Sequence, residues 1–313
     1  MPKRVLAQRY ELDHRLARGG MAEVWRGIDL VLARRVAVKT VSLTDAADPT
    51  LGERMHREAV ATAALEHPDI VTVYDAGVDG DTAYIVMERL RGRDLAAVLR
   101  DGPLPLGEAL RIASRVAGAL AAAHASGVVH RDVKPANILV DGDRVMVVDF
   151  GIAAFEYQSV ASLAEPGTTQ GTAEYMAPEQ ARAESATRST DMYSFGCLLT
   201  ALVAGRPPFT GRRPDAILHQ HVFVEAPRLG RLSPGVPEEL DRLVGDLLAK
   251  DPDRRPSAEE AAEMLTDLAA RVQGATVEAA AGTVLSVAVD GSADAPTIAP
   301  DVVTSATEAH PRP

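Results

Sequence analysis

Residues 128–140 of this chain read VVHRDVKPANILV, an apolar run with a polar centre. Valine, isoleucine and leucine flank the segment, as they do in strands that are buried in a protein core. Charged side chains in such a run are strongly unfavourable unless each one has a partner. The segment is therefore either an exposed loop between two buried strands or the wall of a site that provides those partners.

Polar residues elsewhere in the chain favour the second interpretation. Lys39 ends the strand-like stretch VAVK, and Glu58 lies in a segment with a helical pattern. Either residue alone is most simply read as a surface charge, because Lys and Glu are mostly exposed. A strand Lys and a helix Glu can, however, meet where a helix packs on a sheet. The Glu would then hold the ammonium group where an anion binds.

A second apolar stretch, VMVVDFG, places Asp149 at the end of a strand. Asn137 and Asp149 offer amide and carboxylate oxygens, which are ligands that Mg²⁺ accepts together with water and substrate phosphates. Asp132 is a further acid in this region and is suited to accept a proton from a hydroxyl group. Upstream, the glycine-rich stretch LARGGMAEVW at 16–25 would let backbone N–H groups approach a phosphate.

The composition excludes several classes of protein. A formal net charge of −11 argues against a general nucleic-acid-binding protein. Cys197 is the only cysteine, so neither an intramolecular disulfide nor a cysteine-based zinc site can form. The N-terminal residues lack the apolar stretch of a secretory signal, and no apolar run is long enough to span a membrane. We therefore expect a cytoplasmic protein with no membrane span and no nucleic-acid partner.

The hydrophobic pattern predicts a small β-rich part followed by a larger helical part. Strand-like stretches precede residue 90, interrupted by one helix over 51–67 for which Asp48 and Pro49 would be the N-cap and first residue. The stretch 188–205 is apolar almost all round, which predicts a central buried helix. Helical patterns cover residues 106–127, 188–205, 236–250 and 257–272.

The regular pattern stops at about Gly274. The tail that follows carries five acidic residues and one basic residue among Ala, Thr, Val and Pro, a composition that favours disorder. We expect residues 272–313 to form a disordered acidic tail. Its stretch 283–289, TVLSVAV, would also permit a docking strand.

The order of these features resembles the protein kinase superfamily, and within it the bacterial Ser/Thr protein kinases of eukaryotic type. The resemblance rests on the glycine-rich loop, the strand Lys, the helix Glu, HRDVKPAN, DFG and APE, and it covers about residues 10–271. It implies an α+β, bilobal kinase fold, with a β-rich N-lobe over about 10–88 and a helical C-lobe over about 89–271. It further implies transfer of the γ-phosphoryl group of ATP to Ser/Thr hydroxyls of protein substrates.

The resemblance also assigns roles to single residues. Lys39 is expected to contact the α and β phosphates and to pair with Glu58, while Asp132 acts as the catalytic base. Lys134 is expected near the transferred phosphoryl group. Asn137 and Asp149 are the expected Mg²⁺ ligands. The other expected nucleotide contacts come from the glycine-rich loop, the adenine pocket and the hinge, namely Leu16, Gly19, Gly20, Val24, Ala37, Met87, Glu88, Leu90 and Leu139.

Further residues are implied outside the nucleotide site. Thr172, in GTAEY, resembles the threonine that helps to build the substrate platform. Glu179 and Arg255 resemble a structural ion pair of the C-lobe, and Asp191 resembles the buried helix acid that braces the catalytic loop.

The resemblance also implies a means of regulation through the residue that precedes Asp132. Arg131 is expected to pair with a phosphorylated activation loop. The candidate sites of autophosphorylation are Ser159, Ser162, Thr168 and Thr169, of which we favour the two threonines. Similar kinases can pair through the back of the N-lobe, so a homodimer of that kind also stays open.

The glycine-rich loop departs from the usual G-x-G-x-x-G, because Ala17 and Ala22 stand at its first and third glycine positions. No group with a catalytic role is lost by this change. Two alternatives to an active protein kinase stay open. A pseudokinase scaffold is disfavoured by the intact Lys, Asp and Asn residues named above, and a small-molecule phosphotransferase is disfavoured by GTAEYMAPE, which resembles a peptide-binding platform.

Overall fold

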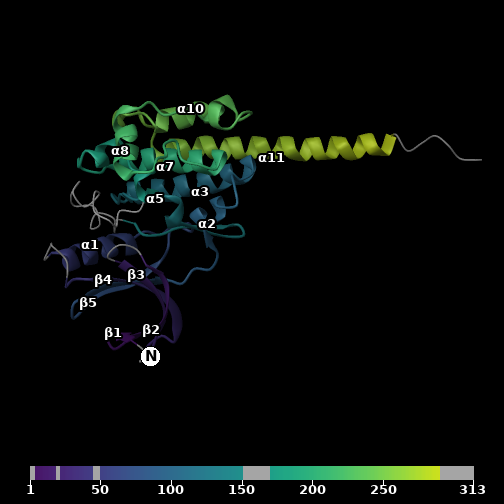
Figure 1. The fold of residues 1–313 in the computed structure, drawn as a ribbon. Helices are drawn as coiled ribbons and strands as arrows, with labels where there is room; N and C mark the ends of the chain where they lie inside the picture. The colour runs from purple at the N-terminus through teal and green to yellow at the C-terminus, as the bar shows by residue number, and fades with distance from the viewer. Residues whose placement is uncertain (1–3, 19–21, 45–49, 151–169, 290–313) are drawn as a thin grey trace, which may run out of the picture. The chain divides into compact units, whose positions relative to one another are not determined.

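The structure is a computed structural model that describes residues 4–18, 22–44, 50–150 and 170–289, with only the backbone described over 275–289 (Figure 1). The chain divides into two compact units, Met1–Arg271 and Val272–Pro313.

The larger unit begins with an antiparallel sheet of six strands in the order β1-β2-β3-β4-β6-β5 (Figure 1). Because side chains alternate along a strand, each face of the sheet buries its own apolar cluster. Val36 and Val38 pack on one face with Tyr84, while Ala37 and Val41 pack on the face that α1 covers. The strands are β1 (Arg4–Leu6), β2 (Tyr10–Arg18), β3 (Ala22–Asp29), β4 (Arg34–Ser42), β5 (Val73–Asp79) and β6 (Thr82–Glu88).

Helix α1 spans Leu51–Ala63, so the predicted helix is present but shorter at its C-terminal end. The predicted N-cap is wrong, because Thr50 is the N-cap and Asp48 lies outside the described residues. The helix begins where its apolar face begins, with Leu51 and Met55 buried against the sheet. Glu58, on the same helix, reaches residues 130–134, the predicted catalytic loop, where it pairs with Arg131.

The rest of the unit is mainly helical. A small sheet of β7 (Arg93–Asp94), β8 (Ile138–Asp141) and β9 (Arg144–Val147) follows the first lobe. The helices are α2 (Leu95–Leu99), α3 (Leu106–Ala125), α5 (Gln170–Ala173), α6 (Pro178–Ala181), α7 (Arg188–Ala204), α8 (Pro214–Phe223), α9 (Leu229–Leu232), α10 (Glu238–Leu247) and α11 (Ala258–Val289), with short 3₁₀ turns η1 (Pro135–Asn137) and η3 (Pro252–Arg254).

Helix α7 forms the centre of this lobe, as its all-apolar sequence predicts. Every residue from Thr190 to Val203 is buried, and α3 and α10 pack against the helix. Gly205 ends it with φ +72°, a left-handed conformation that glycine adopts without strain. The central helix gives the catalytic loop a rigid support.

Helix α11 continues to Val289, past Gly274, where the sequence pattern indicated the end of regular structure. The docking strand considered for 283–289 is therefore wrong, and the disorder expected from residue 272 does not describe the backbone before 290. Alanine-rich segments have high helix propensity, which explains the difference. Among the described residues, no helix combines the length and hydropathy that crossing a membrane would require.

Candidate active site

The catalytic loop is anchored to the first turn of α7 by Asp191. This carboxylate is fully buried and accepts hydrogen bonds from the backbone N–H groups of His130 at 2.8 Å and Arg131 at 2.7 Å. The Nε2 atom of His124 lies 2.8 Å from Oδ2, the same oxygen that accepts from His130. Arg131 has φ +69°, a conformation unfavourable for a non-glycine residue, and Gln180 holds it further by donating to its carbonyl oxygen at 2.8 Å. The predicted bracing role of Asp191 agrees with these contacts.

His130 joins the catalytic loop to the segment that carries Asp149. Its Nε2–H donates to the carbonyl oxygen of Val148 at 3.0 Å, and its Nδ1 accepts from the backbone N–H of Asp132 at 3.3 Å. These two partners require the neutral ring with its proton on Nε2. The ring also packs on Phe150, with centroids 4.5 Å apart.

Lys134 and the predicted metal ligand Asn137 both contact one carboxylate oxygen of the predicted base, Asp132. Oδ2 of Asp132 lies 2.7 Å from the ammonium of Lys134 and 2.9 Å from the amide nitrogen of Asn137, which donates to it. The ammonium of Lys134 also donates to the hydroxyl of Thr172 at 3.1 Å. The carboxylate is therefore fixed in orientation, and a single cation links it to the segment that Thr172 begins.

Asn137 and Asp149 are brought together by the backbone. The N–H of Val148 donates to the carbonyl oxygen of Asn137 at 3.0 Å, which places the following residue, Asp149, beside the η1 turn. The amide nitrogen of Asn137 points to Asp132, so its amide oxygen is the atom left for a metal. These oxygen donors fit a hard cation such as Mg²⁺. Within the described residues, no group of three or more His, Cys, Asp or Glu side chains is placed to hold a metal ion.

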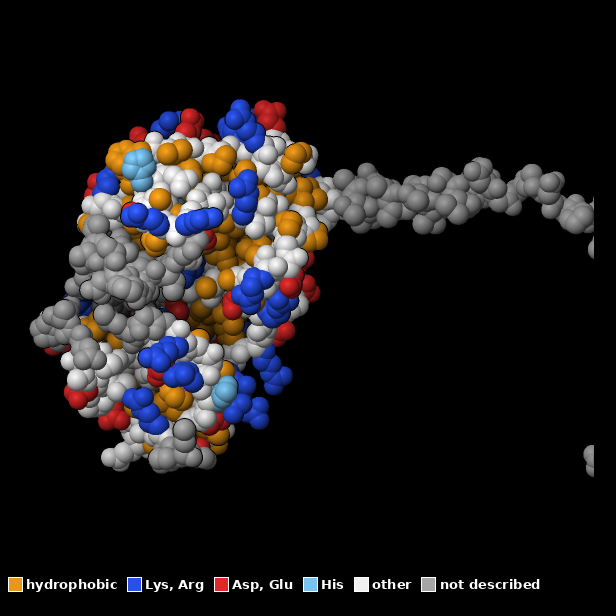
Figure 2. All heavy atoms as spheres, viewed as in Figure 1, with side chains coloured by type: hydrophobic (Ala, Val, Ile, Leu, Met, Phe, Trp, Pro, Cys, Tyr) orange, Lys and Arg blue, Asp and Glu red, His pale blue; other side chains and the backbone are white. Residues whose placement is uncertain are grey.

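Lys39 lies on β4 with Ala37, two residues away on the same face. Val24 stands opposite Lys39 in the ladder, and Met87 stands opposite Ala37. Val24, Ala37, Met87 and Leu90 share one apolar cluster. Figure 2 shows hydrophobic side chains in a hollow between the sheet and the helices.

The other described residues that are predicted to contact the nucleotide do not belong to this apolar cluster. Leu139 is half-buried on β8, whereas Leu16 on β2 has 49% of its surface exposed. The side chain of Glu88 lies 3.3 Å from the guanidinium of Arg144. Gly19 and Gly20 lie outside the described residues.

The expected ion pair between Lys39 and Glu58 is wrong for this structure. Lys39 instead pairs with Asp149 at 3.2 Å, and Glu58 pairs through Oε1 with the guanidinium of Arg131 at 2.7 Å. The other oxygen of Glu58 is buried and has no hydrogen-bond partner in the described part of the chain. Burial raises the pKa of Glu58, and Arg131 opposes that shift. Two positive groups, on Lys39 and Arg131, can therefore pair with two carboxylates in alternative ways. In this structure Lys39 pairs with Asp149 and not with Glu58.

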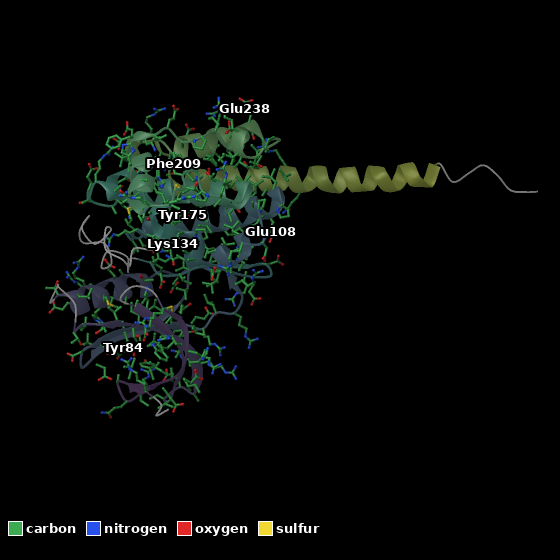
Figure 3. All side chains as sticks on the ribbon, viewed as in Figure 1. Tyr84, Glu108, Lys134, Tyr175, Phe209 and Glu238 are labelled. Atoms are coloured by element: carbon green, nitrogen blue, oxygen red, sulfur yellow. The ribbon has the colours of Figure 1, made fainter. Side chains whose placement is uncertain are left out.

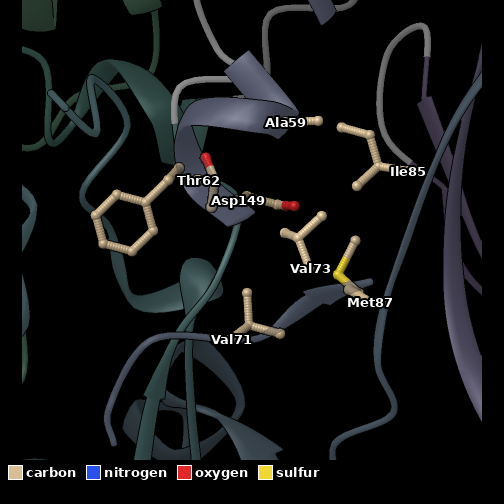
Figure 4. A pocket seen from close by; sticks show the side chains of 8 residues that line it. Ala59, Thr62, Val71, Val73, Ile85, Met87 and Asp149 are labelled. Carbon is tan, nitrogen blue, oxygen red and sulfur yellow. The ribbon is translucent and has the colours of Figure 1, made fainter. Parts of the chain in front are cut away.

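Asp149, the partner of Lys39, lines an apolar pocket (Figure 4). Apolar walls lower the local dielectric constant and so strengthen the attraction between the ammonium and the carboxylate. Residues from α1 and from the sheet line this pocket together with the DFG segment: Ala59, Thr62, Val71, Val73, Ile85, Met87, Asp149 and Phe150.

The predicted ion pair of Glu179 and Arg255 is present and buried. The guanidinium reaches both carboxylate oxygens, at 2.6 and 3.0 Å, and Thr190 donates to one of them at 2.8 Å. Burial alone would raise the pKa of Glu179, but the hydrogen bonds from Arg255 and Thr190 outweigh it and lower that pKa.

The sequence reasoning missed some supporting residues. Gln180 accepts from the backbone N–H of Ala177 at 3.1 Å while it donates to Arg131, so it ties α6 to the catalytic loop. A Gln in the first turn of a helix that starts with Pro178 was an available signal. His221, on α8, was also missed, although its i, i+4 spacing from Ile217 placed both on one buried helix face.

Comparison with known proteins agrees with this geometry. The protein kinase domain model matches residues 10–265. A probable serine/threonine-protein kinase of Corynebacterium efficiens is 43% identical over 274 residues, which cover 84% of this chain and 41% of that protein. Serine/threonine-protein kinase PknB of Mycolicibacterium smegmatis is 43% identical over 269 residues, which cover 84% of this chain and 43% of PknB. The chain thus spans about two fifths of the length of these curated relatives.

A solved structure is similar as well. The kinase domain of Mycobacterium tuberculosis PknI superimposes with a TM-score of 0.69 at 29% identity, covering 85% of this chain and 98% of that domain. The bilobal α+β fold expected from the sequence is therefore confirmed. By its ordered motifs, its fold and these similarities, the chain belongs to the protein kinase family.

Proposed function

We propose that this chain is a Ser/Thr protein kinase that transfers the γ-phosphoryl group of ATP to Ser or Thr hydroxyls of protein substrates. The observation that carries the proposal is the convergence of Lys134 and Asn137 on one oxygen of Asp132, with Thr172 on the same ammonium. A base of fixed orientation beside a cation is what in-line phosphoryl transfer requires. The names of the bacterial relatives given above support the Ser/Thr class.

In this proposal, the substrate hydroxyl gives its proton to Asp132 as its oxygen attacks the γ-phosphorus, and ADP leaves on the opposite side. Lys134 offsets the negative charge of the transferred group. Lys39, from the cleft-facing side of β4, contacts the α and β phosphates. Asn137 and Asp149 would hold Mg²⁺, which neutralises charge on the phosphates when it is bound.

The adenine contacts are proposed for the apolar cluster that faces Lys39. Ala37 and Met87 stand side by side in the ladder, and Val24 and Leu90 complete the cluster. The backbones of Glu88 and Leu90 offer hydrogen-bonding groups at the hinge. Proposed contacts from the glycine-rich loop and the two flanking leucines rest on the sequence pattern alone and concern Leu16, Gly19, Gly20 and Leu139.

We also propose that phosphorylation of the activation loop changes the ion pairs of the site. A phosphate competes well for a guanidinium, so a phosphothreonine would draw Arg131 from Glu58. Glu58 would then be free to take Lys39, and Asp149 would be free for the metal. The candidate residues Ser159, Ser162, Thr168 and Thr169 lie outside the described part of the chain.

A homodimer through the N-lobe is a further proposal. The turn between β3 and β4 exposes Leu30, Val31 and Leu32 at 50%, 71% and 55% of their surfaces, an apolar patch that a second copy would cover. Sedimentation of wild type and Val31→Asp tests it, with Val78→Asp on the exposed part of β5 as the control. Only the Val31 variant should sediment as a smaller species. The lack of a nucleic-acid partner also stays a proposal, supported by the net charge of −11, and so does a cytoplasmic location.

The main proposal is tested by incubating the phosphatase-treated chain with ATP, Mg²⁺ and a generic acceptor protein such as casein, followed by phosphopeptide mass spectrometry. Phosphoserine and phosphothreonine are expected with wild type and should be lost in Asp132→Asn. Asp215→Asn, a change in an exposed ion pair of α8, is the matched control and should behave as wild type. ATP binding without any phosphoryl transfer would instead support the pseudokinase scaffold.

A further inference from the structure

A buried histidine beneath the substrate-binding segment has no part in the proposed reaction. His221 lies near the end of α8 and is fully buried. Its ring packs edge-on against Phe209 and Tyr193, with centroids 5.0 and 5.6 Å away. In Figure 3, Phe209 and Tyr175 lie in the helical lobe that also carries Lys134. Helix α8 packs on α5, which includes the first two residues of the segment 172–176, and on α6, which follows that segment.

A directional chain of hydrogen bonds fixes the protonation of this ring. The ammonium of Lys250 is a donor only, and it donates to the hydroxyl oxygen of Tyr193 at 3.1 Å. The proton of that hydroxyl is then directed to Nδ1 of His221, 3.0 Å away. Because Nδ1 is the acceptor, the neutral ring carries its own proton on Nε2. Burial and, to a smaller extent, the charge of Lys250 lower the pKa of His221 to about 3, which agrees with a neutral ring.

The Nε2–H group at the end of this chain is a buried donor that makes no hydrogen bond of standard geometry within the described residues. The nearest partners belong to the substrate-binding segment, because hydrogen bonding to the backbone of Glu174 and of Ala173 raises the pKa of His221 against the effect of burial. Ala173 packs in one apolar cluster with Phe209 and Ile217. Ile217 lies on α8, one helical turn before His221. A buried donor without a well-formed hydrogen bond is unfavourable, so a small movement of the segment toward His221 would be favourable.

We propose that His221 is a positioning residue for the substrate-binding segment 172–176. Its Nε2–H donates to the backbone carbonyl of Ala173 or Glu174 and so holds this segment in position. The same segment begins with Thr172, whose hydroxyl accepts from Lys134 beside the base. The hydrogen bond would therefore set the position of the phosphate-accepting residue relative to Asp132 without touching ATP. This inference rests on the proposed kinase function.

Two substitutions separate the donor from the rest of the ring. In His221→Gln, the amide nitrogen reaches the position of Nε2 and keeps a donor there. In His221→Asn, the shorter side chain can still accept from Tyr193 but places no donor at Nε2. His219→Gln is the matched control, because His219 is exposed on the same helix and stacks on Phe223.

The measurement is the KM for an acceptor protein and for ATP in each variant. His221→Asn should raise the KM for the acceptor protein by about threefold to tenfold, the effect of one hydrogen bond, and leave the KM for ATP within about twofold. His221→Gln and His219→Gln should stay close to wild type. Equal increases in the Asn and Gln variants would reduce His221 to a packing residue, and no increase in either would also overturn the proposal.

Hydrogen exchange keeps this test separate from the kinase activity itself. Amide exchange of residues 172–176, measured by mass spectrometry with acceptor protein and a non-hydrolysable ATP analogue, should be faster in His221→Asn than in His221→Gln. Indistinguishable exchange in the two variants would refute the positioning role. If wild type transferred no phosphoryl group, the proposed function would fail, while the exchange data would still decide the role of His221.

Discussion

Replacing Asp191 with alanine should release the catalytic loop. The substitution leaves three buried groups without an acceptor: the backbone N–H groups of His130 and Arg131, and Nε2 of His124. Each unsatisfied buried donor is unfavourable by about 1–3 kcal/mol. Removing the carboxylate also removes the unfavourable free energy of burying it, which offsets part of this loss. We therefore expect a net destabilisation of about 3–5 kcal/mol, the usual range for breaking a buried ionic contact.

Urea-induced unfolding followed by the fluorescence of Trp25 measures this effect. With an m value of about 3 kcal/mol/M, the midpoint should fall by about 1–1.7 M in Asp191→Ala. Asp191→Asn keeps one acceptor oxygen and should lose less. Asp215→Ala, in the exposed pair with Arg213, is the control and should leave the midpoint unchanged.

The rate of phosphoryl transfer should fall together with the stability of Asp191→Ala. His130 and Arg131 directly precede the proposed base, Asp132, so a free loop no longer holds the carboxylate against Lys134. A midpoint within about 0.3 M of wild type would show that the loop has another anchor and would refute the reasoning.

Three further predictions concern buried charges. Arg255→Met leaves Glu179 buried without its guanidinium and should lower the free energy of unfolding by about 3–5 kcal/mol; an unchanged melting temperature would contradict this. His221 stays neutral in the folded chain down to a pKa of about 3, whereas the unfolded chain takes up that proton near pH 6.5. Wild type should therefore lose more stability than His221→Gln when urea unfolding is compared at pH 7 and pH 5, and parallel losses would argue against it. Arg131→Ala removes the partner of Glu58, so the ratio of kinase activity between phosphorylated and phosphatase-treated protein should approach one; a ratio equal to that of wild type would exclude Arg131 from the switch.

The sequence pattern was most informative where function depends on residues close together in the chain. Asp132, Lys134 and Asn137 lie within one short loop, so the loop's conformation alone keeps their side chains near each other. The buried helix 188–204 could be predicted for a similar reason, because its residues are apolar on all sides. The roles of the nucleotide-binding residues remain predictions that rest on the resemblance to protein kinases.

Choices between competing partners could not be predicted. Arg131 and Lys39 can each pair with Glu58, and the outcome depends on how α1 lies on the sheet, which no local pattern encodes. His221 was missed because its environment is built by Tyr193 and Lys250, residues about thirty positions away on either side. The helix that extends to Val289 was missed because a mixed, weakly apolar composition is compatible with both helix and disorder.

The central claim is that Asp132 serves phosphoryl transfer by this chain. The most direct test is the intact mass of phosphatase-treated wild type and Asp132→Asn after each is incubated alone with ATP and Mg²⁺. The account predicts that wild type gains mass in steps of one phosphate, with modified peptides that include Thr168 or Thr169, and that Asp132→Asn gains none. Equal gains in both proteins, or no gain in wild type, would contradict it.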